Sequence, residues 1–390
     1  MDSAFPKATI TPEDERQIMD AIEKFLARDV RPYVMALEHD DEYPADIVEG
    51  MKELGLFGAI IPAEYGGLGL PTTTYAKIVE LVSETWMSLS GIFNSHLIMS
   101  SAVIRHGTED QKRTWVPKFA TGEIRGGLAL TEPNCGTDLQ AIRTTAKRDG
   151  DAYVVNGTKT WISNGIHGTV FALLVKTDPA AKPRHAGTSL FLAQKGPGFA
   201  VSRKLEKLGY KGIDSAELVF DNYRIPADRL IGGVEGLGLR HALGGLELGR
   251  INVAARGVGV ASAALKESVK YAQQRETFGK PIAEHQSIQI KLADMATNVE
   301  AARHLTRAAA EAFDRGDRCD MEAGMAKLFA TEAAVTNSME AMRVHGGYGY
   351  SKEFPVERFY RDAPLLVIGE GTNELQRILI ARQLVQRNPI

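Results

Sequence analysis

Cysteine is scarce in this chain, and its scarcity excludes one class of proteins. Only two cysteines, Cys135 and Cys319, occur among the 390 residues. Two thiols cannot form the disulfide framework that stabilises small secreted domains, and such usage is typical of a reducing cytoplasm. No Cys/His cluster has the spacing of zinc ligands, so the sequence predicts no metal site.

Long apolar runs and an excess of positive charge are also missing. No stretch of 18 apolar residues occurs, so no membrane span is predicted. The chain has 46 Lys and Arg against 49 Asp and Glu, and its net charge of −3 gives no basic surface for nucleic acid. The N-terminal stretch MDSAFPKATITPEDER has neither the apolar region of a signal peptide nor an Arg-rich presequence. We therefore expect a cytoplasmic protein of bacterial origin, with no nucleic-acid or membrane partner.

The chain divides into three units in the order helix, β, helix. Residues 1–125 have the apolar spacing of helices, and Thr11-Pro12 is typical of a helix start. Residues 126–235 are rich in Val, Thr and Phe, and Asp149-Gly150 is a strong hairpin signal. Residues 236–390 carry four helical patterns, which we expect to form an antiparallel bundle. The predicted fold class is α+β: an N-terminal all-α domain, a central β-barrel or sandwich of about seven strands, and a C-terminal four-helix bundle.

This order lacks the features of a nucleotide-binding Rossmann domain. Strands and helices do not alternate, and no Gly-x-Gly-x-x-Gly motif follows a predicted strand. The sequence therefore argues against a Rossmann nucleotide domain.

One stretch, residues 343–377, contains a carboxylate in an unusual place. Glu370 follows the apolar run 365–368, and Gly369 and Gly371 flank it. A carboxylate at the end of an apolar run is expected to be poorly solvated, which raises its pKa and makes it a candidate base. Thr372 is a suitable N-cap for a helix from Asn373 to about Arg387, whose free N–H groups could bind a phosphate. The alternative is a glycine-rich turn with an exposed glutamate.

Four further motifs each allow a binding role or a structural one. LALTEPNCGTD (128–138) offers hydrogen-bonding groups for a flat polar ring, or is an ordinary loop. TKTWISNG (158–165) contains Trp161, which could cover a flat cofactor or belong to a core. RETFGKPI (275–282), with Gln286, could bind a pyrophosphate or end a helix. HGGYGY (345–350) permits close backbone approach, or marks a helix C-terminus.

Taken together, these five motifs give the chain a resemblance to the acyl-CoA dehydrogenase family of flavoenzymes. The motifs are LTEPNCGTD, TKTWISNG, RETFGKPI with Gln286, HGGYGY and RDAPLLVIGEGTNELQR. They occur in the family's order, and the resemblance covers residues 10–387. It implies the three-domain acyl-CoA dehydrogenase fold, with boundaries at 1–125, 126–235 and 236–390, bound FAD and a homotetramer.

The resemblance also assigns roles to residues by position. The FAD contacts that it implies are Leu128, Leu130, Thr131, Gly136, Thr137, Trp161, Ile162, Ser163, Arg275, Phe278, Gln286, Arg343, Val344, His345, Gly346, Gly347, Thr372 and Glu374. The group Arg343–Gly347 would come from a partner subunit. The implied substrate contacts are Thr137, Arg250 and Gly371, with Arg250 close to the catalytic carboxylate.

Glu370 matches the family's catalytic base. In the implied reaction it removes the α-proton of an acyl-CoA thioester while the β-hydrogen leaves as a hydride to flavin N5. The product is a trans-2-enoyl-CoA, and an electron-transfer flavoprotein takes the electrons, which places the enzyme in fatty acid metabolism. Neither the length nor the branching of the acyl group can be derived from the sequence.

Some positions depart from the family pattern. A subgroup carries its base immediately before the family arginine, where this chain has Gly249. Glu247 lies two residues away, about 200° round a helix, and is expected to face elsewhere. Arg343 stands where Gln is usual, and Leu128 replaces a frequent aromatic.

Alternatives on the same fold are a flavin monooxygenase, a desulfinase, and a non-dehydrogenating flavoprotein associated with DNA. The retained Glu370 counts against the first two. The third carries a basic C-terminal region, and no such region follows Ile390 in this sequence.

Overall fold

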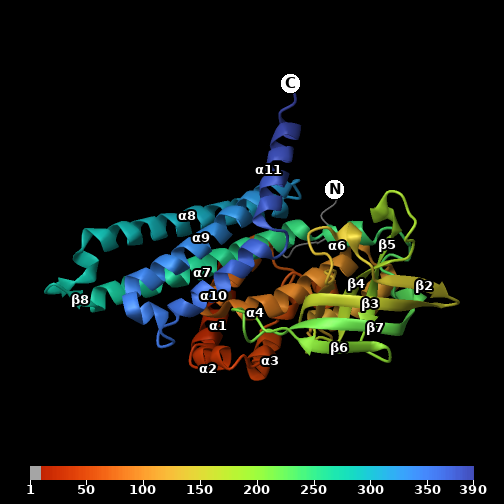
Figure 1. The fold of residues 1–390 in the computed structure, drawn as a ribbon, viewed down its shortest axis with the longest axis horizontal. Coiled ribbons are helices and arrows are strands. Elements are labelled where there is room, and N and C mark those ends of the chain that lie inside the picture. The colour runs from red at the N-terminus through yellow and green to blue at the C-terminus, as the bar shows by residue number, and fades with distance from the viewer. Residues whose placement is uncertain (1–9) are drawn as a thin grey trace.

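The computed structural model describes residues 10–390. Residues 1–9, on which part of the expectation about targeting segments depends, lie outside the described residues. The chain forms a helical domain, a β-sheet and a long helical bundle, in that order (Figure 1). The predicted fold class is confirmed by this element order.

The first helical domain contains five α-helices and ends where the sheet begins. Its elements are α1 (Pro12–Phe25), the π-helical turn η1 (Leu26–Val30), α2 (Val34–His39), α3 (Ala45–Glu53), the short 3₁₀ turns η2 (Leu56–Gly58) and η3 (Ala63–Tyr65), α4 (Thr72–His106) and α5 (Glu109–Ala120). Thr11 caps α1 as predicted, because its side chain accepts a hydrogen bond from the backbone of Asp14. The same arrangement at Thr108 begins α5.

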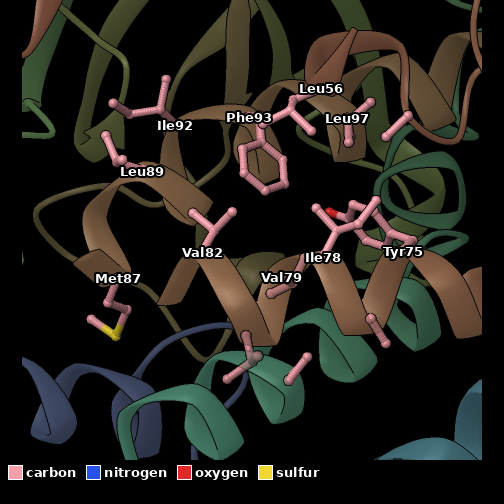
Figure 2. Close-up of a cluster of buried hydrophobic side chains, with 14 of the residues drawn as sticks. Leu56, Tyr75, Ile78, Val79, Val82, Met87, Leu89, Ile92, Phe93 and Leu97 are labelled. Atoms are coloured by element: carbon pink, nitrogen blue, oxygen red, sulfur yellow. The ribbon is translucent and has the colours of Figure 1, made fainter. Parts of the chain in front are cut away.

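The central element of this domain is α4. It is one helix with a kink at Trp86, whose φ of −157° and ψ of 105° are not helical. The helix is long and apolar enough to cross a membrane, but 94% of its most apolar window is buried within the protein. Figure 2 shows Tyr75, Val79 and Phe93 of α4 within the main cluster of buried side chains. Burial by its own neighbours explains the apolar composition of α4.

Seven strands form one curled, mixed sheet. They are β1 (Gly126–Ala129), β2 (Thr145–Asp149), β3 (Ala152–Ser163), β4 (Val170–Lys176), β5 (Thr188–Gln194), β6 (Phe199–Lys204) and β7 (Ser215–Pro226), in the order β1-β4-β2-β3-β7-β6, with β5 also paired to β4. Three short 3₁₀ turns connect them: η4 (Leu139–Ala141), η5 (Arg184–Gly187) and η6 (Ala227–Arg229). The predicted hairpin is present, since Asp149 pairs with Ala152 and Gly150 has a φ of 63°.

Strand β4 lies between two cores. Val170, Ala172 and Leu174 join the main core with the helices, whereas Phe171 and Leu173 join a second core enclosed by the sheet. Alternate side chains of a strand point to opposite faces, and here both faces are covered. This explains why β4 is a continuous apolar run, and it fixes the sheet against α4.

The C-terminal domain is dominated by long helices. Its elements are α6 (Gly238–Leu243), α7 (Leu246–Gln274), the hairpin β8 (Glu276–Thr277) and β9 (Lys280–Pro281), η7 (Ile282–Glu284), α8 (Gln286–Asp314), α9 (Asp320–His345), η8 (Gly346–Tyr350), α10 (Val356–Ile368) and α11 (Asn373–Arg387). Helices α7, α8, α9 and α10 run side by side, and α11 projects away from them (Figure 1). A Cβ at Gly257 of α7 would lie 2.7 Å from the carbonyl oxygen of Ala330 in α9, so the missing side chain allows these two helices to approach closely.

Two details of this domain could not be seen in the sequence. The helical residues that begin the domain are divided at Gly244 and Gly245 into α6 and α7. The apolar run 365–368 is the last turn of α10, which continues through Pro364. Val356, Phe359 and Leu366 are buried on one side of α10, and this packing against α7 and α9 outweighs the cost of a proline within the helix.

Candidate active site

Glu370 lies on a short connection with a strained backbone. Gly369 ends α10 and Thr372 caps α11 by accepting a hydrogen bond from the backbone N–H of Leu375. Glu370 itself has a φ of +51°, in the left-handed region that side chains other than glycine rarely adopt. Such strain is held in place by surrounding structure and is concentrated at functional sites. The connection thus presents the side chain of Glu370 at a fixed point between two helices.

Four side chains and the carboxylate of Glu370 form a closed ring of hydrogen bonds. Asn94 donates to Glu370 Oε1 at 3.1 Å and Arg256 donates to the same oxygen at 3.0 Å. Arg256 Nε donates to Asn252 at 2.8 Å, Asn252 donates to the Tyr75 hydroxyl at 2.8 Å, and Tyr75 donates back to Asn94 at 3.2 Å. We call these residues the carboxylate ring. Because Oε1 receives both donors, Oε2 is the oxygen left to accept a proton.

Burial makes Glu370 a stronger base than an ordinary glutamate. Desolvation raises the pKa of Glu370, and the charges of Arg256 and Lys327 and the hydrogen bond from Asn94 offset it only in part. The side chain keeps 28% of its exposure, so a ligand can reach it from outside. The carboxyl therefore combines access with a raised pKa, as a general base requires.

A buried lysine fixes the connection that carries Glu370. Lys327 of α9 donates to the carbonyl oxygen of Gly371 at 3.0 Å and to the side chain of Asn373 at 2.8 Å. Burial lowers the pKa of Lys327 to about 8, although the carboxylates of Glu370 and Glu374 oppose this effect. Lys327 thus holds the backbone on the C-terminal side of the base, as the carboxylate ring holds its side chain.

Gly249 of α7 lies directly against the base. A Cβ built on Gly249 would be 2.5 Å from Glu370 Oε2, so only glycine leaves this oxygen in its present position. Glu247 is not near the base but lies beside Asp320; burial and the hydrogen bond with Asp320 raise the pKa of Glu247 to about 7. The absence of a side chain at Gly249 therefore leaves room for the carboxylate of Glu370.

We expect Gly249→Ala to lower kcat/KM for acyl-CoA about 10- to 100-fold without loss of fold, because the added methyl group displaces the reactive oxygen. The matched control is Gly245→Ala in the same segment, where a Cβ would meet only Ser101 Oγ, at 3.5 Å. Steady-state kinetics and thermal melting of both variants test this. An unchanged kcat/KM in Gly249→Ala would show that the position of Oε2 is not critical.

Arg250 is half-buried and follows Gly249 directly in the chain. Among residues 10–390, its buried Nε atom has no hydrogen-bond partner. Burial lowers the pKa of Arg250, and Asp320, Glu247 and Glu370 act in the opposite direction. An unsatisfied buried donor is costly, so Arg250 stands out among the predicted site residues.

The sequence analysis missed the residues that hold the base. Arg256, Asn94, Asn252, Tyr75 and Lys327 were not among the predicted site residues. Arg256 was the detectable one, because it is a charged residue within the apolar helical run INVAARGVGVASAAL. The others are polar residues in helices and resemble ordinary core residues when read singly.

The predicted flavin contacts in the sheet lie together at its rim. The loop after β1, which holds Leu130 and Thr131, is joined to β3 because Thr160 donates to the carbonyl oxygen of Thr131 at 2.9 Å. Trp161 stands out from β3 with 58% of its surface exposed and a φ of +60°. Leu128 and Ser163 lie in the adjoining strands β1 and β3, and Ile162 is buried. Gly136 and Thr137 are in the same loop.

Two contacts connect this rim to the base. Asn164, at the end of β3, donates to the carbonyl oxygen of Ile92 in α4 at 2.9 Å. Two residues further along α4, Asn94 binds Glu370. The rim and the carboxylate are therefore attached to the same turn of α4.

A buried ion pair stabilises the loop after β1 at this rim. Lys159 Nζ lies 2.8 Å from Glu132 Oε1 and donates to the carbonyl oxygen of Leu130 at 3.0 Å. The carboxylate of Glu132 also accepts from the backbone N–H groups of Arg143 and Thr144, at 2.6 and 3.0 Å. Burial raises the pKa of Glu132, but Lys159 and these hydrogen bonds outweigh it and hold the pKa below 4.5. The pair fixes the loop that carries the predicted flavin contacts.

The remaining predicted cofactor residues lie at the far end of the bundle. Phe278 is 98% exposed at the tip of the β8–β9 hairpin, with Arg275 before it and Gln286 after it (Figure 1). Val344 packs against Ala272 and Ile282, so the end of α9 adjoins this hairpin within one chain. The side chains of Val344 and His345 are buried, and Arg343 pairs with Glu340.

The residues at the far end and at the rim suit FAD. A Cβ at Gly346 or Gly347 would meet nothing within 4 Å, so their backbone is open to a ligand. Trp161 and Phe278 expose large aromatic faces and both have a positive φ, as Glu370 does. At the start of α11, Thr372 already caps the helix, and the carboxylate of Glu374 lies on its first turn with a lowered pKa caused by its own backbone N–H.

One group of side chains could hold a metal ion among residues 10–390, but a cation already occupies it. Glu38, His39 and Glu357 lie close together. Arg361 binds Glu38 at 2.5 Å and Glu357 at 2.7 Å. The group is an ion-pair network between α2 and α10 and lies apart from the base.

Comparison with known proteins identifies the class. Models of the acyl-CoA dehydrogenase family match the chain in three segments: the N-terminal domain at residues 12–123, the middle domain at 127–223 and the C-terminal domain at 236–385. The chain therefore belongs to the acyl-CoA dehydrogenase family, a family of flavoprotein oxidoreductases, and the resemblance of the sequence is confirmed.

Individual relatives agree with this result. An acyl-CoA dehydrogenase of Bacillus subtilis (strain 168) is 40% identical over 375 residues, which cover 96% of this chain and 98% of the relative. The structure of butyryl-CoA dehydrogenase from Megasphaera elsdenii matches with a TM-score of 0.93 and 33% identity, over 97% of this chain and 100% of that one. A chain from a structure of the electron transferring flavoprotein of Acidaminococcus fermentans matches with a TM-score of 0.93 and 35% identity, over the same shares.

Proposed function

We propose that the protein is an FAD-dependent dehydrogenase that introduces an α,β double bond into an acyl-CoA thioester, with Glu370 as the base. The observation that carries this proposal is the carboxylate ring: a glutamate with raised pKa is held by two donors on Oε1, and Oε2 is left to accept a proton. The α-proton of a thioester is a weak acid, so its removal needs such a base.

Four residues have separate roles in the proposed reaction. Glu370 takes the α-proton on Oε2, beside Gly249. Asn94 and Arg256 keep the carboxylate oriented, and Lys327 fixes the backbone after it. When bound, FAD would accept the β-hydrogen as a hydride. The product is a trans-2-enoyl-CoA.

We assign the flavin ring to the rim formed by the loop after β1 and by Trp161, and the adenosine end to the β8–β9 hairpin and Gly346-Gly347. The support for this assignment is the exposed aromatic faces and the open glycine backbone at these two places. The sheet and the β8–β9 hairpin lie at opposite ends of the folded molecule in Figure 1. We therefore propose that one FAD is bound by residues of two subunits.

A homotetramer is the proposed assembly, and an electron-transfer flavoprotein the proposed electron acceptor. Helix α11 projects from the bundle and exposes Ile378, Leu384 and Val385, an apolar surface that contact with another copy would cover. The match to a chain in a structure of an electron transferring flavoprotein supports that partner. We place the enzyme in the cytoplasm.

The test is anaerobic reduction of the bound flavin. The purified holoenzyme is mixed with butyryl-, hexanoyl-, octanoyl-, isovaleryl- and glutaryl-CoA in turn, and the oxidised flavin band is followed. The proposal expects at least one acyl-CoA to bleach the band. If the protein binds FAD and none of the panel bleaches it, these five acyl groups are excluded as substrates, and the flavin monooxygenase or binding alternative gains support. Failure to bind flavin after reconstitution would overturn the cofactor assignment.

A further inference from the structure

Arg256 is a buried positive charge, although a neutral donor such as Asn94 is enough to orient the same oxygen of Glu370. It lies on α7 among apolar residues and is 5% exposed, and its guanidinium touches three side chains: Asn252, Glu370 and the Tyr210 hydroxyl, the last at 3.0 Å. A base is weakened by a neighbouring cation, since the positive charge of Arg256 lowers the pKa of Glu370. Removing Arg256 would make Glu370 more basic, so proton abstraction alone does not account for the arginine.

Proton transfer would leave Arg256 without a counter-ion. The ionisable groups facing its guanidinium are Glu370, Tyr75 and Tyr210. Burial raises the pKa of both tyrosines, which therefore stay neutral near pH 7. Once Glu370 has taken up the α-proton, no anion faces Arg256. An uncompensated buried charge is strongly unfavourable, and a hydrocarbon chain cannot relieve it.

We propose that the acyl group of the substrate carries a carboxylate, which binds Arg256 and the Tyr210 hydroxyl beside Glu370. This inference rests on the proposed function and names its substrate class: short dicarboxylic acyl-CoA thioesters. The carboxylate of the substrate supplies the anion that Arg256 loses when Glu370 is neutralised. A guanidinium is suited to this role, because two of its N–H groups can bind one carboxylate.

The position of Arg256 limits the length of the acyl group. Arg256 Nη2 lies 3.0 Å from Glu370 Oε1, so a carboxylate bound to it lies within about 6 Å of that oxygen. The α-carbon must lie about 3–3.5 Å from the carboxylate that takes its proton. The two ends of the acyl group are thus only a few C–C bonds apart, which corresponds to acyl groups of about four to six carbons.

The surroundings of Tyr210 hold its hydroxyl in a fixed position. Its backbone N–H donates to the buried carboxylate of Asp362 at 2.5 Å, and its φ is +57°. A Cβ on Gly91 of α4 would coincide with the Tyr210 hydroxyl, at 1.5 Å, so α4 leaves space for this oxygen to reach Arg256. The hydroxyl is therefore held beside the guanidinium from two sides.

The experiment compares acyl-CoAs matched in carbon number. Succinyl-, glutaryl- and adipoyl-CoA are paired with butyryl-, pentanoyl- and hexanoyl-CoA, and glutaramoyl-CoA replaces the carboxylate of glutaryl-CoA by a neutral amide. Dissociation constants are measured by calorimetry on the Glu370→Gln holoenzyme, in which turnover is slowed at least about 10²-fold. Rates of flavin reduction are measured on the wild-type holoenzyme. We expect one dicarboxylic thioester to bind about 10- to 100-fold more tightly than its hydrocarbon partner and the amide, the range for a hydrogen bond to a charged group.

Variants at Arg256 and Tyr210 assign the preference to these residues. In Arg256→Gln the ratio of the two dissociation constants should fall to about 1, and Arg256→Lys should restore part of it. Tyr210→Phe, which keeps the ring, should reduce the ratio by less. If Arg256→Gln does not fold, Arg256→Lys and Tyr210→Phe still give the comparison.

Each outcome bears on the inference. Equal or tighter binding of the hydrocarbon thioesters overturns it, and so does equal binding of glutaramoyl-CoA. A preference for the carboxylate that survives in Arg256→Gln removes Arg256 from the recognition. Reduction of the flavin by hydrocarbon thioesters alone would refute this substrate class and leave the proposed dehydrogenation intact, whereas no reduction by any thioester would refute the dehydrogenation itself.

Discussion

We expect the Glu370→Gln variant to reduce its flavin with acyl-CoA at least about 10²-fold more slowly than the wild type, while FAD content and fold are retained. Loss of a general base has effects of this size. Glutamine keeps the shape of the side chain and can still accept from Asn94 and Arg256, but its amide cannot take up the α-proton. Stopped-flow mixing under anaerobic conditions measures the rate, and the visible spectrum gives the FAD content.

The control for this variant is Glu353→Gln, which changes an exposed glutamate in the same C-terminal segment and should leave the rate unchanged.

The pH dependence of the rate distinguishes a base from a structural residue. A base must be ionised, and the pKa of Glu370 is raised, so the rate should fall as pH falls through a value above the 4.5 of an ordinary glutamate. Flavin reduction by Glu370→Gln at near the wild-type rate would exclude Glu370 as the base.

The order of helical and β segments and the turn around Glu370 could be predicted from the sequence, because both depend on residues close together in the chain. Thr372 as a cap, the Asp149-Gly150 hairpin and the glycines beside Glu370 are short-range signals, and the structure has the predicted cap and hairpin. Helix α10 was not predicted; it contains Pro364, and the packing that stabilises it comes from α7 and α9.

The carboxylate ring could not be predicted for a different reason. Its members Tyr75, Asn94, Asn252, Arg256 and Glu370 come from three segments, and only the tertiary fold brings them together. Even Arg256, visible as a charge within an apolar helix, has no partner that the sequence alone identifies. The same applies to β1, whose parallel pairing with β4 joins strands about 40 residues apart.

The second large effect is expected at the rim of the sheet. Glu132→Gln should lower the free energy of unfolding by about 3–5 kcal/mol at pH 7, because it leaves the ammonium of Lys159 buried without a counter-ion. The side chains of Lys159 and Glu132 are 0% and 2% exposed, so water cannot replace the lost charge. Urea denaturation of the holoenzyme measures the change, and FAD should be lost at a lower urea concentration because the pair supports the flavin loop.

An exposed pair provides the control. Glu49→Gln removes the partner of Lys52, at 2.7 Å on the surface of α3, and should cost less than about 1 kcal/mol. The sign of the pH dependence follows from the lowered pKa of Glu132. A carboxyl with a lowered pKa contributes stability above its ordinary pKa and loses it as pH falls through its folded value, so the difference between wild type and Glu132→Gln should shrink below pH 4.5. A difference that does not change with pH, or one as small as that of Glu49→Gln, would contradict the assignment.

The carboxylate ring has a consequence for how the enzyme acquires its activity. Tyr75 and Asn94 belong to α4 of the first domain, whereas Asn252, Arg256 and Glu370 belong to the last. An excised C-terminal domain would carry the base without two of the four side chains that orient it. Catalytic competence is therefore a property of the docked domains, and during refolding it should return with their assembly, after the helices themselves have formed.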